Sequence, residues 1–385
     1  MSKQWKVWLA NLCIGLYRAL CPRPRASGPS QSFSRIVVFS TTALGDFMFN
    51  TPAIRALREK YPNARITLVA NPRNRDLVRG CHFVDDVVYW DHKAKSLVAT
   101  IRSLRRRRPE LAMILHSKAP YDVVAATLAG CTYVFKNIYD DEQPGLERWL
   151  AGATRTCDAG HLIQSKLNLV GQLGCNTTNA EMFVPVHPAS ASSPRKTIIG
   201  FQLGASQPVR CWPVGHFVQL ARSLLAESDE TQIALIGSDK ESLLANHLLA
   251  ALTEPERQRV INYVGRTSLS ELLGAIQGMA VLVSGDTGPL HLAIALKVRT
   301  VSLFATACPT KTGPYQDPAL HKVIRLPADA AAVTTALQPS PMSLIAVEDV
   351  RQAVVHAIRG AEVQDRPRLP DAGRTVRVPA GLSPA

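Results

Sequence analysis

Short apolar runs alternate with amphipathic stretches along most of the chain, in two successive series. Runs rich in Val, Ile and Leu predict buried strands. The predicted strands are 35–40, 66–70, 84–89 and 111–115 in the first series, and 197–203, 232–237, 281–284 and 300–304 in the second. The predicted helices are 47–60, 162–173, 214–227, 240–252, 268–277 and 347–359. Alternation of this kind is typical of parallel sheets joined by right-handed crossovers.

Changes in composition divide the chain into parts. Residues 35–186 form a predicted N-terminal Rossmann-like domain, and 187–196 read as a low-complexity linker. A second Rossmann-like domain is predicted over 197–360, followed by a tail rich in Pro, Arg and Gly over 361–385, which we expect to be disordered. A length of 385 residues also suits two domains. The sequence therefore predicts an α/β fold of two Rossmann-like domains that face a central cleft.

Residues 1–34 form an extension before the first strand, with a predicted amphipathic helix and a Pro- and Gly-containing linker. The apolar residues at helical spacing are Trp5, Trp8, Leu9, Leu12, Leu16 and Leu20. The uncharged stretch is too short to span a bilayer, which takes about 20 residues, and Arg18 argues against a signal peptide. A basic helix with tryptophans favours attachment to an anionic membrane surface through residues 1–25. Packing of this helix on the protein's own core is the alternative.

The net charge of +14 implies a positive field that attracts phosphates, nucleic acid or an anionic membrane. No nucleic-acid recognition motif accompanies it, so we do not expect nucleic acid as a partner. The arginines at 102 and 105–108 are either a solvated helix end or a surface that faces the acceptor. Eight cysteines show neither metal-ligand spacing nor a disulfide pattern, which favours reduced thiols in the cytosol and no metal site.

Three loops follow predicted strands, where α/β sheets bind ligands. The first, STTALGD, ends at Asp46, and Gly45 in it permits a tight turn. From spacing alone, Asp46 is either a functional carboxylate or a helix N-cap. The second, SGDTGPLH, spans 284–291 and combines two glycines with a helix start, a combination suited to phosphate. In the third, GASQPVRCWP, Arg210 is a phosphate-binding candidate and Trp212 is expected in the core.

Together these segments resemble glycosyltransferase family 9, which contains the lipopolysaccharide heptosyltransferases. The family's LGD loop and following TPA-L helix read ALGDFMFNTPAIRAL here, and its PGAS segment reads LGASQPVRCWP. Its DTG-x-x-HLA motif reads GDTGPLHLAIAL and is followed later by TGPY. The resemblance extends from about residue 35 to residue 359. It implies a GT-B fold with the active site between the domains, and an inverting, metal-independent transfer that needs no cofactor beyond the nucleotide sugar.

The resemblance also implies roles for individual residues. Asp46 would be the catalytic base, with Thr42 and Gly45 in the loop near the reacting centre, and Arg210 would neutralise the donor diphosphate. Asp239 would hold the ribose. The remaining donor-binding residues implied are Asp286, Thr287, Gly288, Pro289, Leu290 and His291.

The implied reaction is heptose transfer from ADP-heptose to lipopolysaccharide core or a related lipid-linked envelope glycan, on the cytoplasmic face of the inner membrane. Two departures from the family pattern bear on the ligands. Ser40 stands where many members have a basic residue, and Ala305 replaces a glycine. A different nucleotide-sugar donor, or a non-catalytic glycan- or nucleotide-binding member, are the alternatives.

Overall fold

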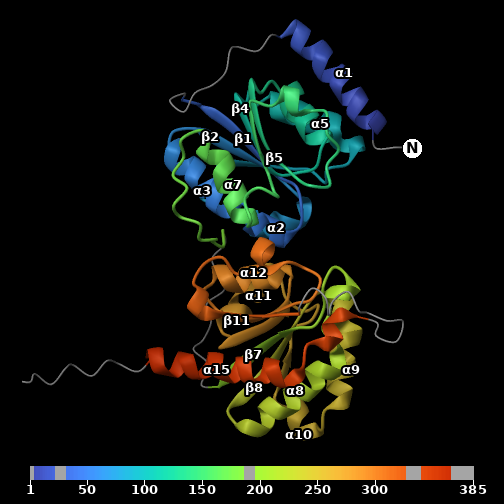
Figure 1. The fold of residues 1–385 in the computed structure, drawn as a ribbon, viewed down its shortest axis with the longest axis vertical. Coiled ribbons are helices and arrows are strands. Elements are labelled where there is room, and N and C mark those ends of the chain that lie inside the picture. The colour runs from blue at the N-terminus through green and yellow to red at the C-terminus, as the bar shows by residue number, and fades with distance from the viewer. Residues whose placement is uncertain (1–3, 22–31, 186–195, 327–339, 366–385) are drawn as a thin grey trace, which may run out of the picture.

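The computed structural model describes residues 4–21, 32–185, 196–326 and 340–365, which form two α/β halves stacked end to end (Figure 1). The strands of the first half are β1 (Arg35–Ser40), β2 (Arg65–Ala70), β3 (Asp86–Tyr89), β4 (Leu111–His116), β5 (Tyr133–Ile138) and β6 (Gly152–Arg155). Those of the second are β7 (Thr197–Gln202), β8 (Thr231–Ile236), β9 (Val260–Asn262), β10 (Val281–Gly285), β11 (Arg299–Phe304) and β12 (His321–Arg325).

Both sheets are parallel and have the same topology. The strand orders are β3-β2-β1-β4-β5-β6 and β12-β11-β10-β7-β8-β9. In each sheet the direction of winding reverses beside the first strand, between β1 and β4 in one half and between β7 and β10 in the other. Such a reversal is where doubly wound sheets bind ligands. The three loops singled out from the sequence follow β1, β7 and β10, so all three lie at these two reversals.

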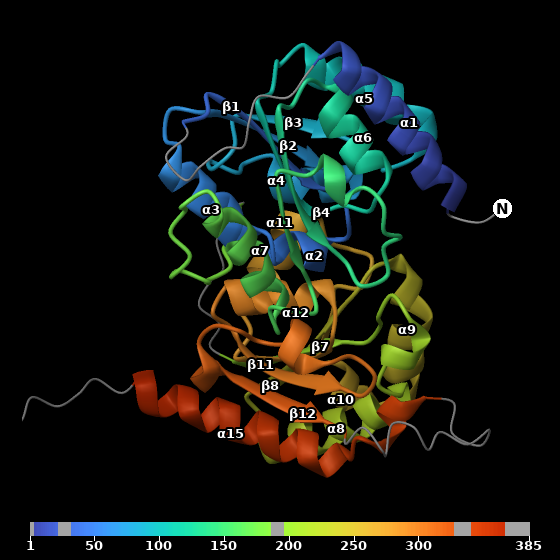
Figure 2. The same ribbon diagram turned by 45° about the horizontal axis from the view of Figure 1, so that its top comes forward.

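Helices cover the sheets and meet at the junction of the two halves (Figure 2). In the first half they are α1 (Gln4–Leu20), α2 (Leu44–Met48), α3 (Thr51–Lys60), α4 (Arg75–Val78), α5 (Ala94–Arg105), α6 (Tyr121–Leu128) and α7 (Leu162–Gly171). In the second they are α8 (Val214–Glu227), α9 (Ser242–Ala251), α10 (Glu254–Arg257), α11 (Leu269–Gln277), α12 (Gly288–Ala295), α13 (Pro309–Thr312) and α15 (Val347–Asp365). One apolar core continues across the junction, since Met48 and Leu290 belong to the same buried cluster.

Two predicted helices have different bounds in the structure. The helix predicted over 47–60 is two helices, because Pro52 restricts the residue before it and starts α3 in a new direction. The last helix continues to Asp365 rather than ending at 359, so the predicted tail begins later than residue 361. Ala361, Glu362 and Gln364 all favour helix, and Pro367 is the first residue that cannot continue it. The predicted linker at 187–196 lies almost wholly outside the described residues.

The helix α1 packs on the first half through one face only. Val7, Ala10 and Ile14 are buried, and the Arg18 guanidinium donates to the Cys131 carbonyl at 2.9 Å. The opposite face is apolar and exposed, with Trp8 67% and Leu16 62% accessible. Packing on the protein's own core is therefore confirmed for one side of the helix. None of the described helices is long and apolar enough to cross a bilayer.

The arginine cluster at 102 and 105–108 lies at the C-terminal end of α5, beside the amino ends of the strands of the first sheet. Arg107 pairs with Asp86 at 2.6 Å, and Arg35 donates to the Arg108 carbonyl at 2.7 Å. Asp86 and Arg35 begin their strands, whereas ligands bind beyond the carboxyl ends. The cluster therefore lies at a helix end, as one interpretation of the sequence predicted, on the edge of the sheet opposite the ligand-binding ends. That it faces the acceptor stays a prediction.

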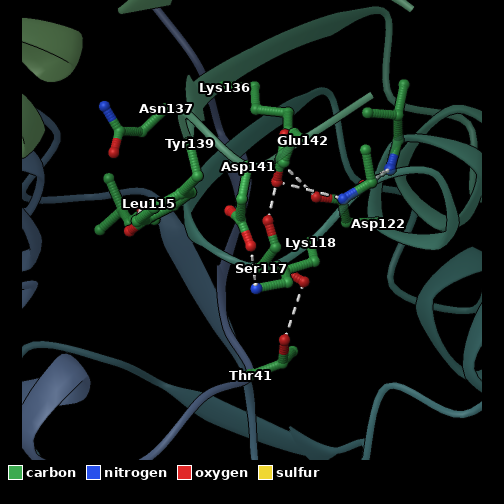
Figure 3. A network of polar contacts seen from close by, with 12 residues as sticks. Thr41, Leu115, Ser117, Lys118, Asp122, Lys136, Asn137, Tyr139, Asp141 and Glu142 are labelled. Atoms are coloured by element: carbon green, nitrogen blue, oxygen red, sulfur yellow. Dashed lines mark hydrogen bonds and ion pairs between the residues drawn. The ribbon is translucent and has the colours of Figure 1, made fainter. Parts of the chain in front are cut away.

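A buried ionic network joins β5 to the elements around it (Figure 3). Lys136 Nζ lies 2.5 Å from Asp122 Oδ2 and 3.1 Å from Glu142 Oε1, and it donates to the Ser117 carbonyl at 2.7 Å. Lys136 is 2% exposed and Asp122 is fully buried. The Lys136 ammonium therefore has a partner for each of its three N–H groups, namely two carboxylates and a carbonyl oxygen.

We expect Lys136→Met to lower the free energy of unfolding by about 3–5 kcal/mol, because it leaves two buried carboxylates without their cation. Lys118→Met is the matched control. Lys118 Nζ forms a 2.7 Å ion pair with Asp141, but both side chains are more than half exposed, so its loss should cost about 1 kcal/mol or less. Urea unfolding of both variants measures the difference. Equal effects would show that the buried network adds no special stability.

Candidate functional site

Asp46 lies at the junction, in the first turn of α2. The N-cap of this helix is Ala43, with no side-chain cap, so the N-cap interpretation of Asp46 is wrong. The carboxylate side chain is 35% exposed. Burial raises the pKa of Asp46, and the nearby His291 opposes that rise most strongly. A carboxylate that is half buried, raised in pKa and still open to solvent has the properties of a general base.

The loop before Asp46 fits closely against the second half. A Cβ on Gly45 would lie 2.9 Å from His291 Cδ2, and one on Gly288 would lie 2.9 Å from Leu44 Cδ2. Glycine is required at both positions because α2 and α12 approach each other so closely. The Thr42 carbonyl accepts a hydrogen bond from Asn74 at 3.0 Å, which holds the loop in place. The structure thus brings the LGD loop and the DTG loop face to face.

Three residues that the sequence did not single out lie beneath Asp46. His116 ends β4, and its Nε2 is 3.8 Å from Asp46 Oδ2. The Tyr139 ring stacks on His116 with centroids 4.4 Å apart, and Lys166 of α7 donates to the Tyr139 hydroxyl. Burial and neighbouring lysines hold the pKa of His116 well below its ordinary value, so its ring is neutral at pH 7. Only the fold brings β4, β5 and α7 together, and no local motif marks these residues.

On the donor side, Asp286 holds three side chains in place. Arg210 Nη1 lies 3.4 Å from Asp286 Oδ2, and the Thr312 hydroxyl donates to the same oxygen at 3.3 Å. His291 Nε2 lies 3.4 Å from Asp286 Oδ1. Arg210 Nε is buried and has no hydrogen-bond partner among the described residues. A guanidinium with an unused donor is suited to an anionic ligand.

The DTG loop leads into the N-terminus of α12. Thr287 is the N-cap, its hydroxyl lies 2.9 Å from that of Ser284, and Pro289 stands in the first turn. The first backbone N–H groups of a helix lack partners within it and carry partial positive charge. Leu290 is fully buried and belongs to the apolar cluster that continues across the junction. His291 is 3% exposed and packs on Phe49 across the junction, with ring centroids 4.5 Å apart.

Asp239 and Glu241 follow β8, in a short helical turn (Asp239–Glu241). Asp239 is exposed and lies beside Gly265, where a Cβ would be 2.1 Å from Asp239 Oδ1. Glu241 was not predicted. Its carboxylate accepts from Ser238 N and Oγ at 2.7 Å, and it lies against Gly204, where a Cβ would be 2.3 Å from Glu241 Cγ. Glu241 is therefore closer than Asp239 to the loop that carries Arg210.

The remaining features complete the placement of the predicted residues. Trp212 is 3% exposed and its indole N–H donates to the Ile345 carbonyl at 3.1 Å, so its predicted core role is confirmed. Ser40 is fully buried and accepts from Asn50 at 2.8 Å. Within the described ranges, no group of three or more His, Cys, Asp or Glu is arranged to hold a metal ion.

Comparison with known proteins gives consistent results. Glycosyltransferase family 9 (heptosyltransferase) matches residues 137–336, more than half of the chain. Lipopolysaccharide heptosyltransferase 2 of Escherichia coli (strain K12) is 28% identical over 315 residues, covering 76% of this chain and 88% of that protein. Lipooligosaccharide heptosyltransferase 2 of Haemophilus influenzae is 33% identical over 132 residues, which cover 34% of this chain and 37% of that protein.

Solved structures share the fold. A glycosyl transferase family 9 protein from Veillonella parvula superposes with a TM-score of 0.72 at 19% identity, covering 86% of this chain and 98% of that one. The E. coli ADP-heptose lps heptosyltransferase II has a TM-score of 0.70 at 23% identity, covering 85% and 99%. The predicted GT-B fold is confirmed. With its motifs gathered at the junction of two Rossmann-like halves, the chain belongs to glycosyltransferase family 9 and is a glycosyltransferase.

Proposed function

We propose that this protein transfers a heptose from ADP-heptose to lipopolysaccharide core or a related lipid-linked envelope glycan, with inversion at the sugar. One observation carries the proposal. The Asp46 carboxylate on α2 and the Arg210–Asp286–His291 group beside α12 lie on opposite sides of the same tight junction. A base and an anion-binding group on facing helix ends are what displacement of a nucleoside diphosphate requires. The names of the relatives supply the donor and the acceptor class.

In the proposed reaction, Asp46 takes the proton of an acceptor hydroxyl as that oxygen attacks the anomeric carbon. The bond between this carbon and the diphosphate oxygen breaks, and its electron pair leaves with ADP. Attack opposite the leaving group inverts the configuration. Positive charge for the departing diphosphate comes from Arg210 and from the start of α12, where the backbone N–H groups of Thr287 and Gly288 and the helix dipole lie. These groups allow departure without a metal ion or other cofactor.

The ribose and the base need a place on the second half. The loops after β7 and β8 are the candidates for this place, because the first carries Arg210 and the second lies next to it. Glu241 lies between them, and Asp239 is exposed at their edge. We therefore propose Glu241 together with Asp239 for the ribose hydroxyls. Carboxylates accept hydrogen bonds from vicinal hydroxyls, which is the common mode of ribose recognition in Rossmann folds.

ADP release by the purified protein tests this function. The assay uses ADP-heptose and a panel of other nucleotide sugars as donors, with extracted truncated lipopolysaccharide as acceptor. Release that requires both ADP-heptose and acceptor would support the proposal. Turnover with a different donor would keep the mechanism and replace the sugar. Donor binding without turnover on any acceptor of the panel would favour a non-catalytic member of the family.

We further propose that the exposed face of α1 lies on the cytoplasmic surface of the inner membrane, where a lipid-linked acceptor is found. Trp5, Trp8, Leu12 and Leu16 are exposed on one amphipathic helix. Basic side chains lie beside it, since the Arg105 guanidinium is 5.8 Å from the centre of the Tyr17 ring. Apolar residues that enter the headgroup region, combined with cations near anionic lipid, are the two contributions that interfacial helices use.

We expect the triple variant Trp8→Ser, Leu12→Ser and Leu16→Ser to reduce binding to anionic lipid vesicles by roughly tenfold or more, because it removes the apolar area that enters the membrane. Its melting temperature should stay near that of the wild type, since the buried face is untouched. Deleting the whole helix would be a poorer test, because it would uncover the residues that Ile14 covers. Vesicle sedimentation measures binding.

Leu243→Ser is the control for general loss of apolar surface. Leu243 is 72% exposed, but it lies on α9 of the second half, away from α1. Its replacement should leave vesicle binding unchanged. Undiminished binding of the triple variant would remove α1 as the membrane contact.

A further inference from the structure

Among the described residues of the first half, two lysines are buried, and they differ in what surrounds them. Lys136 is neutralised by Asp122 and Glu142 in the network described above. Lys166, in the middle of α7, is fully buried as well, but its hydrogen bonds go to two neutral oxygens, Asn137 Oδ1 and the Tyr139 hydroxyl. Among the described residues it has no carboxylate as a direct partner. A buried ammonium without a counter-ion is costly, so its placement calls for a reason.

The path from Lys166 leads to the proposed base. Its ammonium lies 4.5 Å from the centre of the Tyr139 ring, and the same ring stacks on His116. His116 in turn has its Nε2 3.8 Å from Asp46 Oδ2. The imidazole is neutral, so it transmits no charge of its own. Among the described lysines of the first half, Lys166 is the one whose charge acts on Asp46, and the stacked rings of Tyr139 and His116 lie between the two groups.

Charge coupling between the two groups supports this reading. Among the charges that act on Lys166, Asp46 is the largest that favours the ammonium, ahead of Glu142, while Lys136 opposes it. The ionised form of Asp46 is favoured most by His291 of α12, then by hydrogen bonding with Thr42 and Ala43, and also by the charge of Lys166. Burial is the largest effect on both groups: it lowers the pKa of Lys166 and raises that of Asp46, and the charge of each partner opposes the shift of the other.

We propose that Lys166 is a positioning residue for the base: its buried ammonium, behind the Tyr139–His116 stack, is the counter-charge on the first-half side of Asp46 and adds to His291 in keeping that carboxylate ionised. The inference rests on the proposed role of Asp46. It explains why a lysine rather than a leucine occupies the buried face of α7. It also explains why neutral rings separate the two charges, since a direct ion pair would hold the carboxylate away from the acceptor hydroxyl.

The test follows the titration of Asp46 directly, by carbon NMR of protein labelled at the aspartate γ-carboxyl. The Asp46 signal is assigned by its loss in Asp46→Asn. In Lys166→Met, which keeps the side-chain length without the charge, we expect the Asp46 midpoint to rise by about one pH unit. The midpoint of the acid limb in the pH profile of kcat should move to higher pH by the same amount, so that kcat is roughly tenfold lower on the acid side. The two profiles should converge at higher pH.

Two further variants separate charge from packing. Tyr139→Phe removes the hydroxyl that binds the ammonium but keeps the stack, and it should move the Asp46 midpoint in the same direction by less. Leu167→Ala loosens the same helix without changing any charge, and it should leave the midpoint where it is. An unmoved midpoint in Lys166→Met, or an equal movement in Leu167→Ala, would overturn the inference. The NMR titration needs no turnover, so a wild-type protein that transfers no sugar would count against the proposed function alone.

Discussion

Replacing Asp46 with Asn is expected to lower kcat by about 10²–10⁴-fold, the usual contribution of a general base. The amide has nearly the same shape but cannot take the acceptor's proton. The donor KM should change little, because the donor contacts proposed above lie on the second half. Comparison of kcat and KM for Asp46→Asn and wild type, with saturating acceptor, measures both. Transfer at the wild-type rate would mean that another group accepts the proton.

Asp46→Asn is expected to lower activity but not stability. Burial raises the pKa of Asp46 above that of the unfolded chain. A group of this kind contributes stability below its unfolded pKa and loses that contribution as pH rises through the folded pKa. At neutral pH the ionised carboxylate therefore lowers stability, and Asp46→Asn should melt at the same temperature as wild type or higher. The difference should shrink as pH falls toward the ordinary aspartate range.

An exposed aspartate gives the control for this thermal measurement. Asp229 lies in the second half with its side chain fully exposed. Asp229→Asn should change neither kcat nor the melting temperature appreciably. A clear drop in the melting temperature of Asp46→Asn would assign Asp46 a structural role in addition to, or in place of, catalysis.

The elements that position the site were predictable from local sequence. The strand at β1 coincides with its prediction, and α8 and the Ser268–Glu271 capping box also appear where expected. These elements have strong apolar periodicity or a specific cap, which neighbours in space do not override. The strands β5, β6, β9 and β12 were not predicted. In β5 the buried Lys136 and Asn137 interrupt the apolar run, and β9 has three residues.

The residues of the site also fall into those that local sequence could predict and those that it could not. Asp46, Arg210 and Asp286 belong to motifs with recognisable spacing that follow strands, and the fold brings those motifs to one junction. His116 and Lys166 could not be found in this way. Each is a single polar residue in an apolar strand or helix, and a lone residue of this kind shows its role only when β4 and α7 are packed together.

Replacing Arg210 with Met is expected to lower kcat by about 10²–10³-fold, which is typical when one group that stabilises developing charge is removed. As the bond to the sugar breaks, negative charge grows on the diphosphate. Arg210, steadied by Asp286 at 3.4 Å and with its Nε unused by the protein, is placed to meet that charge. Because the charge is greatest in the transition state, kcat should fall more than the affinity for ADP.

Two control variants test whether this loss depends on the charge and geometry of Arg210. Arg210→Lys keeps the charge but lacks the planar fork, so it should retain an intermediate rate. Arg222→Met removes an arginine of the same half that is 51% exposed, and it should leave transfer unchanged. Stopped-assay kcat values, set beside ADP dissociation constants from calorimetry, separate binding from catalysis. If Arg210→Met weakened ADP binding as much as it slowed transfer, Arg210 would hold the nucleotide without assisting its departure, and the helix end at Thr287 would have to supply the stabilisation alone.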